Sequence, residues 1–384
     1  MMEAIVLAGG LGTRLRSVVS EVPKCMAPVA GKPFLWYLLT YLARYPEVHR
    51  VVLSVGYLRE VIFEWIASVS GQFPFPIDYA VEEVPLGTGG GIRLALSKCT
   101  SDEVLVLNGD TMFDVDLPRM LQAHAARPDA AVTLALKPLQ QFDRYGRVSL
   151  DAGGVITGFH EKQPCADGLI NGGVYLVRPS RLDLSALPER FSFEKEVFEP
   201  HVAQRDLYGY VSEGFFIDIG IPADYQRAQF EFLARYCSYD TLLLDRDGTI
   251  NVRRPGDYVK TWQEFRFRPE FLQWAFLLGR TFRRVFVVTN QRGIGRGVMT
   301  EQALGDIHRE MCRILAEDYG LRVERIFYAT GTSDTDPCRK PQTGMWHELL
   351  EACPDVQAER TVMIGDGDCD EAFARNCHIA FVRV

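Results

Sequence analysis

The feature that most constrains the fold is a short apolar segment that runs into a glycine-rich loop near the start of the chain. Residues 5–8 have the length of a buried strand, and three glycines follow within four positions. Glycines in such a loop let backbone N–H groups approach an anion closely. A hydroxyl and two cations come next, and they can neutralise a departing phosphate group. The segment therefore predicts a strand that leads into a phosphate-binding and nucleotide-binding loop, while the glycines alone fit a tight strand-to-helix turn equally well. The candidate residues are Leu7, Ala8, Gly9, Gly10, Gly12, Thr13, Arg14 and Lys24.

Apolar segments of strand length and helix length alternate behind this loop. The alternation predicts parallel β-α-β units and a doubly wound α/β sheet, in which ligands bind at the carboxyl ends of the strands. Gly87 and Thr88 open a glycine-rich helix start after such a strand end, so they are candidates for contact with a nucleotide. The spacing alone fits a flexible helix start equally well. The predicted strands are 5–8, 50–55, 77–81 and 103–107, and the predicted helices are 33–45, 57–69 and 87–97.

Two aspartates of the first half follow predicted strands. Asp110 comes after residues 103–107, and Asp218 comes after the apolar residues 214–217. Carboxylates from two strand ends can hold Mg²⁺ against phosphate groups, which supply the rest of its ligands. Each aspartate taken singly fits a turn or capping residue better. The two aspartates are therefore candidate ligands of a magnesium ion.

The string G-G-x-G-T-R-L, followed at short range by P-K, resembles the signature of the sugar-1-phosphate nucleotidyltransferases. It is unlike the dinucleotide fingerprint G-x-G-x-x-G and unlike the Walker motif. The resemblance spans about residues 3–230. The stretches RLRSVVSEVPKCMAPVAGKPF and LNGDTMFDVD are most similar to the guanylyltransferases of D-glycero-D-manno-heptose 1-phosphate. One departure is Cys25, which stands where the family usually has proline.

The resemblance implies a Rossmann-like domain with a mixed sheet that uses GTP and a heptose 1-phosphate as substrates. It also implies that Arg14 and Lys24 are catalytic, and that Mg²⁺ at Asp110 and Asp218 bridges the nucleotide α-phosphate and the sugar phosphate. Short strands with turn signals, 145–150, 155–161 and 170–177, form the predicted sugar side. The residues that the resemblance assigns to the sugar and its phosphate are Glu161, Lys162 and Asn171. Without the resemblance, Lys162 would be read as a solvated surface charge.

A second domain is predicted to begin with almost no linker, giving domains of residues 1–237 and 238–384. The strand T-L-L-L ends in Asp245-Arg246-Asp247-Gly248-Thr249. A carboxylate at a strand end can act as a nucleophile, and a second carboxylate two residues on can act as general acid and base. A bare D-x-D string fits a pair of turn aspartates equally well.

Three later landmarks are the string T-N-Q after residues 285–288, the string C-R-K-P at 338–341 and the string G-D-G-D-C-D after residues 362–364. They also lie at predicted strand ends, and their order resembles that of the haloacid dehalogenase superfamily. By this resemblance, Asp245 is the aspartyl-phosphate nucleophile, Asp247 is the acid and base, and Asp366 completes a Mg²⁺ site with Asp245 and the Asp247 carbonyl. Asp370 would support that site. The strings DRDGTIN, VTNQRGIGRG and CRKPQTG look most like the D-glycero-D-manno-heptose 1,7-bisphosphate 7-phosphatases, with no room for a large cap domain. The expected phosphate-binding residues are Thr289, Asn290, Arg339 and Lys340.

Composition excludes several classes of partner. The 384 residues carry a formal net charge of −8, which argues against a nucleic-acid or anionic-membrane partner. Nine scattered cysteines without a C-x-x-C pair indicate reduced thiols and a cytoplasmic location. Many phosphatases of the resembled family have a Cys/His-rich loop before R-K-P. Residues 329–339 offer only Cys338, so we expect Mg²⁺ at both sites and no zinc.

The sequence thus predicts an enzyme that removes the 7-phosphate of a heptose 1,7-bisphosphate and then converts the heptose 1-phosphate and GTP to GDP-heptose and pyrophosphate. Two alternatives are open at this stage. One is a nucleotidyltransferase for another sugar 1-phosphate or base, joined to a histidinol-phosphatase-like domain. The other is a regulatory nucleotide-sugar-binding module attached to a phosphatase. The sequence does not assign an oligomeric state or the residue that reads the base.

Overall fold

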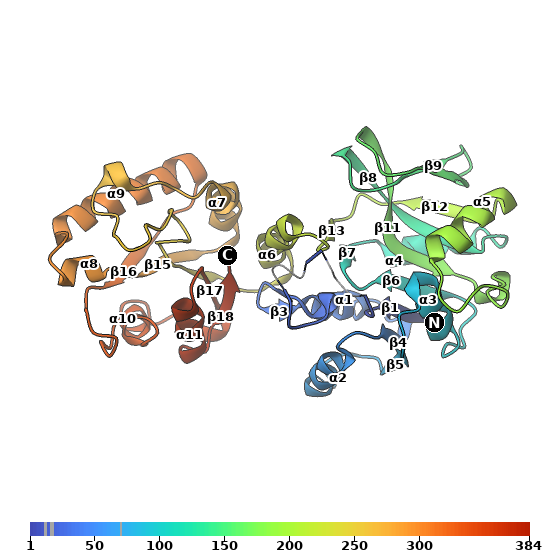
Figure 1. Ribbon diagram of the computed structural model, residues 1–384, viewed down its shortest axis with the longest axis horizontal. Coiled ribbons are helices and arrows are strands. Elements are labelled where there is room, and N and C mark those ends of the chain that lie inside the picture. Colours follow the sequence, from blue (N-terminus) through green and yellow to red (C-terminus); the bar gives the residue numbers. More distant parts are fainter. Residues whose placement is uncertain (11–13, 16–18, 70) are drawn as a thin grey trace. The chain divides into compact units, whose positions relative to one another are not determined.

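The computed structural model describes residues 1–10, 14–15, 19–69 and 71–384. The chain forms two compact units, each of which is described by itself (Figure 1). The N-terminal unit comprises Met1–Pro28 and Lys32–Tyr225, and the C-terminal unit comprises Val29–Gly31 and Gln226–Val384. Domain limits at residues 237 and 238 stay a prediction. The elements where the chain passes between the units are β2 (Pro28–Val29), β3 (Lys32–Pro33) and α6 (Pro222–Tyr236).

The N-terminal unit is built on a mixed sheet, as predicted, with parallel strands at its centre. Within the described residues it has nine strands, and β1 pairs in parallel with β4 on one side and β6 on the other. These strands are apolar because both faces of the sheet are covered. The parallel strands are β1 (Met2–Leu7), β4 (Val48–Val55), β5 (Ile77–Val81) and β6 (Val104–Asn108).

Leu7 pairs with Ser54 on one neighbouring strand and with Asn108 on the other, and Ser54 pairs with Ala80 of β5, so the loops after these strands emerge at one edge of the sheet. The loops that follow β1, β5 and β6 carry the glycine-rich segment, Glu82 and Asp110. Gly109 fits there because a Cβ at its position would lie 2.3 Å from the Leu7 carbonyl oxygen. The loops that were predicted to form a site at the carboxyl ends of the strands therefore do meet at one edge of the sheet.

The other part of the sheet is largely antiparallel and extends the unit away from the parallel centre (Figure 1). Its longest strand, β11, pairs with β6, β8 and β9, and its register shifts between Asn171 and Tyr175. The shift accounts for the Asn-Gly-Gly string, since Gly173 has a φ of +72° and a Cβ on Gly172 would lie 2.3 Å from the Phe113 ring. The strands are β8 (Val132–Phe142), β9 (Arg147–Leu150), β10 (Ile156–Phe159), β11 (Cys165–Val177) and β12 (Leu207–Val211).

Helices and short strands complete this unit. The glycine run that opens α3 admits a neighbouring segment of the chain, because Cβ atoms on Gly89 and Gly90 would lie 2.2 Å from the Phe191 ring and 2.5 Å from the Glu189 carbonyl oxygen. The remaining elements are η1 (Lys24–Met26), α1 (Phe34–Leu42), α2 (Arg59–Ser68), α3 (Gly87–Leu96), β7 (Thr111–Phe113), α4 (Leu117–Ala125), η2 (Pro179–Arg181), η3 (Glu194–Phe198), α5 (Glu199–Gln204) and β13 (Phe216–Asp218).

The C-terminal unit is a doubly wound parallel sheet of five strands in the order β16-β15-β14-β17-β18, counted over its described residues. Leu244 pairs with Val287 and Ile364, so the ends of β14, β15 and β17 meet at one edge. The elements are β14 (Thr241–Leu244), η4 (Trp262–Glu264), α7 (Pro269–Thr281), β15 (Arg284–Asn290), α8 (Arg292–Gly295), α9 (Glu301–Tyr319), β16 (Arg325–Ala329), α10 (Gly344–Ala352), η5 (Ala358–Arg360), β17 (Thr361–Gly365), α11 (Asp368–Asn376) and β18 (Ala380–Arg383).

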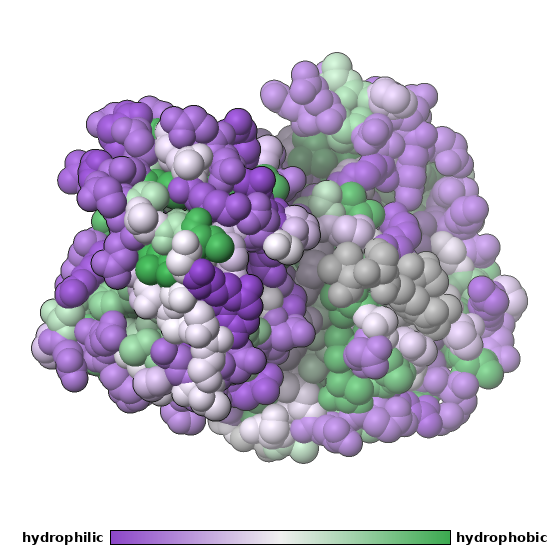
Figure 2. All heavy atoms as spheres, turned by 60° about the vertical axis from the view of Figure 1, so that its left-hand side comes forward, coloured by the Kyte–Doolittle hydropathy of each residue, from purple (hydrophilic) through white to green (hydrophobic). Residues whose placement is uncertain are grey.

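The α/β class predicted for both halves is confirmed. The face in Figure 2 is mostly hydrophilic, with hydrophobic residues in small groups. Among the residues that the structure describes, no helix combines the length and the apolar character needed to cross a bilayer.

Candidate active sites

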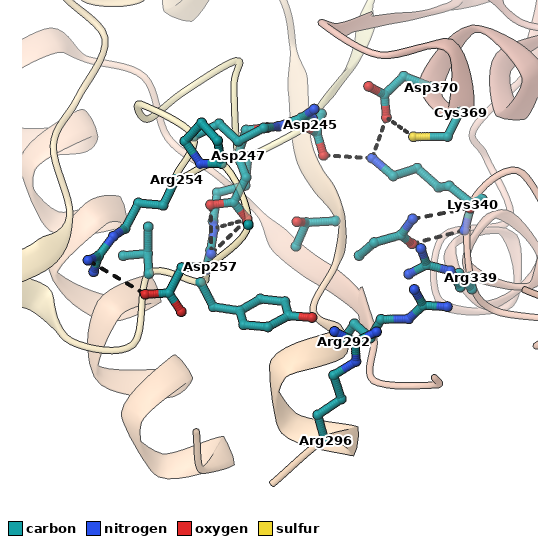
Figure 3. Close-up of a pocket in the computed structure, with 18 residues that line it drawn as sticks. Asp245, Asp247, Arg254, Asp257, Arg292, Arg296, Arg339, Lys340, Cys369 and Asp370 are labelled. Carbon is teal, nitrogen blue, oxygen red and sulfur yellow. Dashed lines mark hydrogen bonds and ion pairs between the residues drawn. The ribbon is translucent and has the colours of Figure 1, made fainter. Parts of the chain in front are cut away.

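The end of β14 brings a nucleophile-type carboxylate into contact with a buried lysine. Lys340 Nζ lies 2.6 Å from Asp245 Oδ1 and 2.6 Å from Asp370 Oδ1, and it also donates to the Val288 carbonyl oxygen at 2.7 Å (Figure 3). The three charged side chains are almost completely buried. A buried cation is tolerated when it is paired in this way. Lys340 therefore balances two carboxylates that belong to different elements.

Burial and the neighbouring charges shift the pKa values of the side chains in this cluster. Burial and the neighbouring Asp370 raise the pKa of Asp245, while Lys340 acts in the opposite direction. Burial would lower the pKa of Lys340, but Asp245 and Asp370 together hold it above its ordinary value. Lys340 is therefore the charged partner, and Asp245 depends on a nearby cation to stay ionised.

The second aspartate of the D-x-D string is held by four N–H groups of other side chains. The fully buried Arg246 donates to Asp247 at 2.7 Å through Nη2 and at 3.1 Å through Nε. Asn251 Nδ2 donates at 3.0 Å, and Gln291 Nε2 donates at 2.8 Å. Burial would raise the pKa of Asp247, but Arg246 and the other donors keep it below its ordinary value. Arg246 in turn contacts His308 Nε2 at 3.2 Å. Asp247 is thus positioned as a proton acceptor.

The same edge of the sheet holds a cluster of carboxylates that suits a divalent cation. Oxygen atoms of Asp245, Asp366 and Asp370 lie within 4.8 Å of one another. Arg253 places its guanidinium against this cluster, since Nη2 lies 2.8 Å from Asp366 Oδ1 and Nε lies 3.1 Å from the Asp247 carbonyl oxygen. A side-chain cation thus bridges two of the oxygens predicted to bind Mg²⁺. Hard oxygen donors around a cationic position fit such an ion.

Besides Lys340, several arginines line this pocket, whose volume is about 420 Å³. Arg292, Arg296 and Arg339 gather on one side of it (Figure 3). Asp334 holds two of them, with Oδ1 at 2.7 Å from Arg292 and 3.3 Å from Arg339. The pocket therefore offers positive charge at a second position besides Lys340.

The N-terminal unit has a separate cavity of about 460 Å³ at the carboxyl edge of its parallel strands. Lys24 lies between Asp110 and Asp218: it contacts Asp110 closely, and its Nζ lies 3.5 Å from Asp218 Oδ1. Burial and the neighbouring Asp110 raise the pKa of Asp218, and Lys24 opposes the shift. Here too a lysine ammonium stands between the two carboxylates that were predicted to hold Mg²⁺.

Comparison with known proteins shows what kind of protein carries these sites. Residues 3–235 match the family model described as "Nucleotidyl transferase". The chain belongs to the nucleotidyl transferase family. Residues 240–383 of this nucleotidyltransferase match a second model, described as "Polynucleotide kinase 3 phosphatase". The N-terminal match covers the Lys24 site, and the C-terminal match covers the Asp245 site.

Relatives with known names resemble the N-terminal part. A D-glycero-alpha-D-manno-heptose 1-phosphate guanylyltransferase of Aneurinibacillus thermoaerophilus is 46% identical over 60% of this chain and 98% of its own length. One from Campylobacter jejuni is 41% identical over 58% of this chain and 97% of its own. The crystal structure of HddC from Yersinia pseudotuberculosis complexed with GMP-PN is 31% identical, with a TM-score of 0.53, and covers 60% of this chain and 100% of that chain. The homologues and the phosphatase match support both enzyme activities.

The nucleotidyltransferase cavity contains most of the predicted nucleotide residues. Leu7, Ala8, Gly9, Gly10, Lys24, Gly87, Thr88 and Asp110 line it. Gly12 and Thr13 lie outside the described residues, and Arg14 is exposed. Glu161 and Lys162 are exposed and are not among the described residues that line this cavity, and Asn171 is half-buried and bonded to Tyr175 and to the Gly173 amide. Their sugar-binding roles stay predictions.

The phosphatase pocket brings together Asp245, Asp247, Thr289, Asn290, Arg339 and Lys340. Asn290 contributes mainly to its framework, because its side chain bonds the Lys340 backbone through both polar atoms. Asp366 is outside the described lining but lies within the carboxylate cluster, in which Asp370 is a full member. The geometry groups the carboxylates of Asp245, Asp366 and Asp370. The ligand predicted from Asp247 is its backbone carbonyl, and Asp370 was predicted to support the site, so the metal set stays a prediction.

Sequence reasoning missed several residues of these sites. Glu82 directly follows β5, so the strand-end rule that found Asp110 could have found it. Arg246 stands in the D-R-D string, but the sequence did not indicate that its side chain is buried or that it contacts Asp247. Arg190 and Arg253 gave no local signal, because both reach their sites through the conformation of irregular segments.

Proposed function

We propose that this chain is a bifunctional enzyme of sugar-nucleotide synthesis. In this proposal, the C-terminal site hydrolyses the 7-phosphate of D-glycero-D-manno-heptose 1,7-bisphosphate. The N-terminal site then joins the heptose 1-phosphate to GTP and releases GDP-heptose and pyrophosphate. The reactions interlock, since guanylyl transfer needs the anomeric phosphate that the hydrolysis leaves in place. The 46% identity to a heptose 1-phosphate guanylyltransferase supports the second reaction.

The observation that carries the first reaction is the presence of two groups of positive charge in the phosphatase pocket. Lys340 supplies one positive centre beside Asp245, and Arg292, Arg296 and Arg339 supply another. A substrate with a single phosphate needs only the first centre. Arginine guanidinium groups bind phosphate with paired N–H donors, so the second centre suits a second phosphate on the same sugar. A sugar bisphosphate therefore fits this pocket better than a monophosphate does.

We assign the phosphatase chemistry to the two aspartates of the D-x-D string. Asp245 attacks phosphorus, the bond between phosphorus and the sugar oxygen breaks, and Asp247 relays a proton from solvent to that oxygen. Water then attacks the aspartyl phosphate while Asp247 takes a proton from it, which restores Asp245 and releases phosphate. Asp245, Asp366, Asp370 and the Asp247 carbonyl would hold Mg²⁺, which neutralises charge on the phosphoryl oxygens when bound. Lys340 and Thr289 orient the phosphoryl group.

In the other unit, an oxygen of the sugar phosphate attacks the α-phosphorus of GTP, and the bond to the β-phosphate breaks. Lys24 and Arg14 stabilise the charge on the departing pyrophosphate. Asp110 and Asp218 would hold Mg²⁺, whose charge favours attack at the α-phosphate. We propose Mg²⁺ at both sites and no zinc, and metal analysis of untagged protein checks the latter.

The test is a reaction followed by ³¹P NMR with heptose 1,7-bisphosphate, Mg²⁺ and a choice of GTP, ATP or UTP. We expect loss of the 7-phosphate only, followed by a diphosphate signal that requires GTP. Release of the anomeric phosphate would contradict the phosphatase assignment. Faster turnover of histidinol phosphate, or of glucose 1-phosphate with UTP, would favour a different pair of substrates.

A further inference from the structure

The acid and base of the proposed phosphatase reaction is connected to a buried histidine of a different element. Asp247 contacts Arg246, and Arg246 in turn contacts His308 of α9, 62 positions further along the chain. Arg246 and His308 are 1% and 8% exposed. His308 is not among the described residues that line the pocket, so a role in the reaction has to pass through Arg246.

The Arg246 guanidinium is held at both of its ends. On one side, Nη2 lies 2.7 Å from Asp247 Oδ2 and 2.9 Å from Oδ1, and Nε lies 3.1 Å from Oδ2. On the other side, Nη1 lies 3.2 Å from His308 Nε2. The donors of a planar guanidinium have a fixed arrangement, so a contact at one end sets the direction of the donors at the other. His308 therefore helps to set how Arg246 meets the carboxylate.

The contact also defines which nitrogen of His308 is the acceptor. A guanidinium has donors only, so Nε2 must accept, and the hydrogen of a neutral ring then lies on Nδ1. Burial and the positive Arg246 lower the pKa of His308 to about 3, from 6.5. The ring is therefore neutral at physiological pH, and it acts on Arg246 as a hydrogen-bond acceptor.

Arg246 controls the rotation of the Asp247 carboxylate more than the other two donors do. Asn251 and Gln291 each contact one carboxylate oxygen, whereas Arg246 contacts both. The two amides are also shared with other acceptors, since Asn251 Nδ2 lies 3.0 Å from the Val252 carbonyl oxygen and Gln291 Nε2 lies 2.9 Å from Thr289 Oγ1. A shift of the guanidinium would therefore turn the carboxylate, and the amides could not restore its orientation.

We propose that His308 is a positioning residue for proton transfer by Asp247. Its Nε2 fixes the guanidinium of Arg246, and the guanidinium fixes the carboxylate that delivers a proton to the sugar oxygen as the bond from that oxygen to phosphorus breaks. The attack of Asp245 on phosphorus does not involve this chain of contacts. The inference rests on the proposed phosphatase chemistry, and it applies to any sugar phosphate that the site hydrolyses.

The test compares two leaving groups through kcat/KM, which reports the steps up to departure of the leaving group. A sugar oxygen needs a proton to leave, whereas acetyl phosphate releases acetate without one and is small enough for a pocket of about 420 Å³. His308→Leu should lower kcat/KM for heptose 1,7-bisphosphate by about 10- to 100-fold and for acetyl phosphate by less than about 3-fold, because only the first reaction needs a well-placed acid.

Two further variants separate positioning from packing. His308→Gln places a carbonyl oxygen where Nε2 can be replaced as acceptor, so it should keep kcat/KM for the bisphosphate within about 3-fold of the wild-type value. Leu315→Ala removes a buried side chain from the same helix face, two turns further along, and should change both substrates by the same factor. Hydrogen exchange across α9 checks that the helix remains formed in each variant.

The outcomes separate this inference from the proposed function. If the wild-type protein hydrolyses neither substrate, the proposed phosphatase activity fails and this inference fails with it. If the wild type hydrolyses both but His308→Leu loses the same factor on both, only this inference is overturned. A loss with His308→Gln as large as with His308→Leu also overturns it, and this comparison needs the bisphosphate alone.

Discussion

Replacing Lys340 by methionine should expose how much the phosphatase unit depends on its buried charge cluster. The Lys340 side chain is 1% exposed, and its partners Asp245 and Asp370 are 7% and 1% exposed. Methionine fills a similar volume without the charge, which leaves two buried carboxylates without their common cation. Removing one partner of a buried ion pair typically costs about 3–5 kcal/mol. We expect a loss of unfolding free energy in that range in the absence of divalent cations.

Hydrogen exchange of the β14 amides, measured by mass spectrometry in EDTA, reports the free energy of opening at this site. Exchange in β6 of the other unit is the internal control and should not change. Asp370→Asn should cost less in the Lys340→Met background than alone, because it then removes an unpaired charge. Mg²⁺ should restore part of the protection. A loss below about 1 kcal/mol, or additive effects of the two substitutions, would refute this account of the cluster.

Two other predictions concern charges whose partners the structure identifies. Arg253→Gln removes a half-exposed guanidinium from Asp366, and this contact is worth up to about 1 kcal/mol. The affinity for Mn²⁺, measured by EPR in an Asp110→Asn background, should therefore rise by up to about 5-fold. An unchanged Mn²⁺ affinity would contradict a role for this contact. Burial and the positive Arg178 lower the pKa of His124 to about 4, from 6.5. The folded state therefore keeps the ring neutral, and stability falls as pH drops from 6.5 to about 4, by at most roughly 3 kcal/mol. His124→Gln should remove this part of the pH dependence in urea titrations, and an unchanged slope would argue against a buried neutral ring.

The parallel strands were predictable because burial on both faces makes them continuous apolar runs. β1, β6 and β14 are of this kind: β6 and β14 lie within one residue of the predicted bounds, and β1 begins three residues before its predicted start. β8 was missed because only its first half is buried, while its second half is polar and partly exposed. The expected short strands near β9, β10 and β11 were found, but the length of β11 depends on pairing with β8, which local sequence does not reveal.

Site residues at strand ends were predictable because the apolar runs that mark the strands also mark where the strands end. Lys24 and Asp218 are 194 positions apart, yet topology brings both to the carboxyl edge of one unit. The contact between Arg253 and Asp366 depends on the path of an irregular loop, for which periodicity gives no information. Glu161 and Lys162 were assigned to the sugar by resemblance alone. Both side chains are exposed, so their sugar-binding role stays a prediction.

The central claim is that two independent active sites on one chain carry out successive reactions. Assaying Asp245→Asn and Asp110→Asn for both reactions tests it most directly. Asp245→Asn cannot form an acyl phosphate, so phosphate release should fall by about 10⁴-fold or more, while pyrophosphate release from GTP and heptose 1-phosphate continues. Asp110→Asn should weaken guanylyl transfer and leave hydrolysis of the bisphosphate intact. If either substitution abolished both activities in a folded protein, the account of two separate sites would be contradicted.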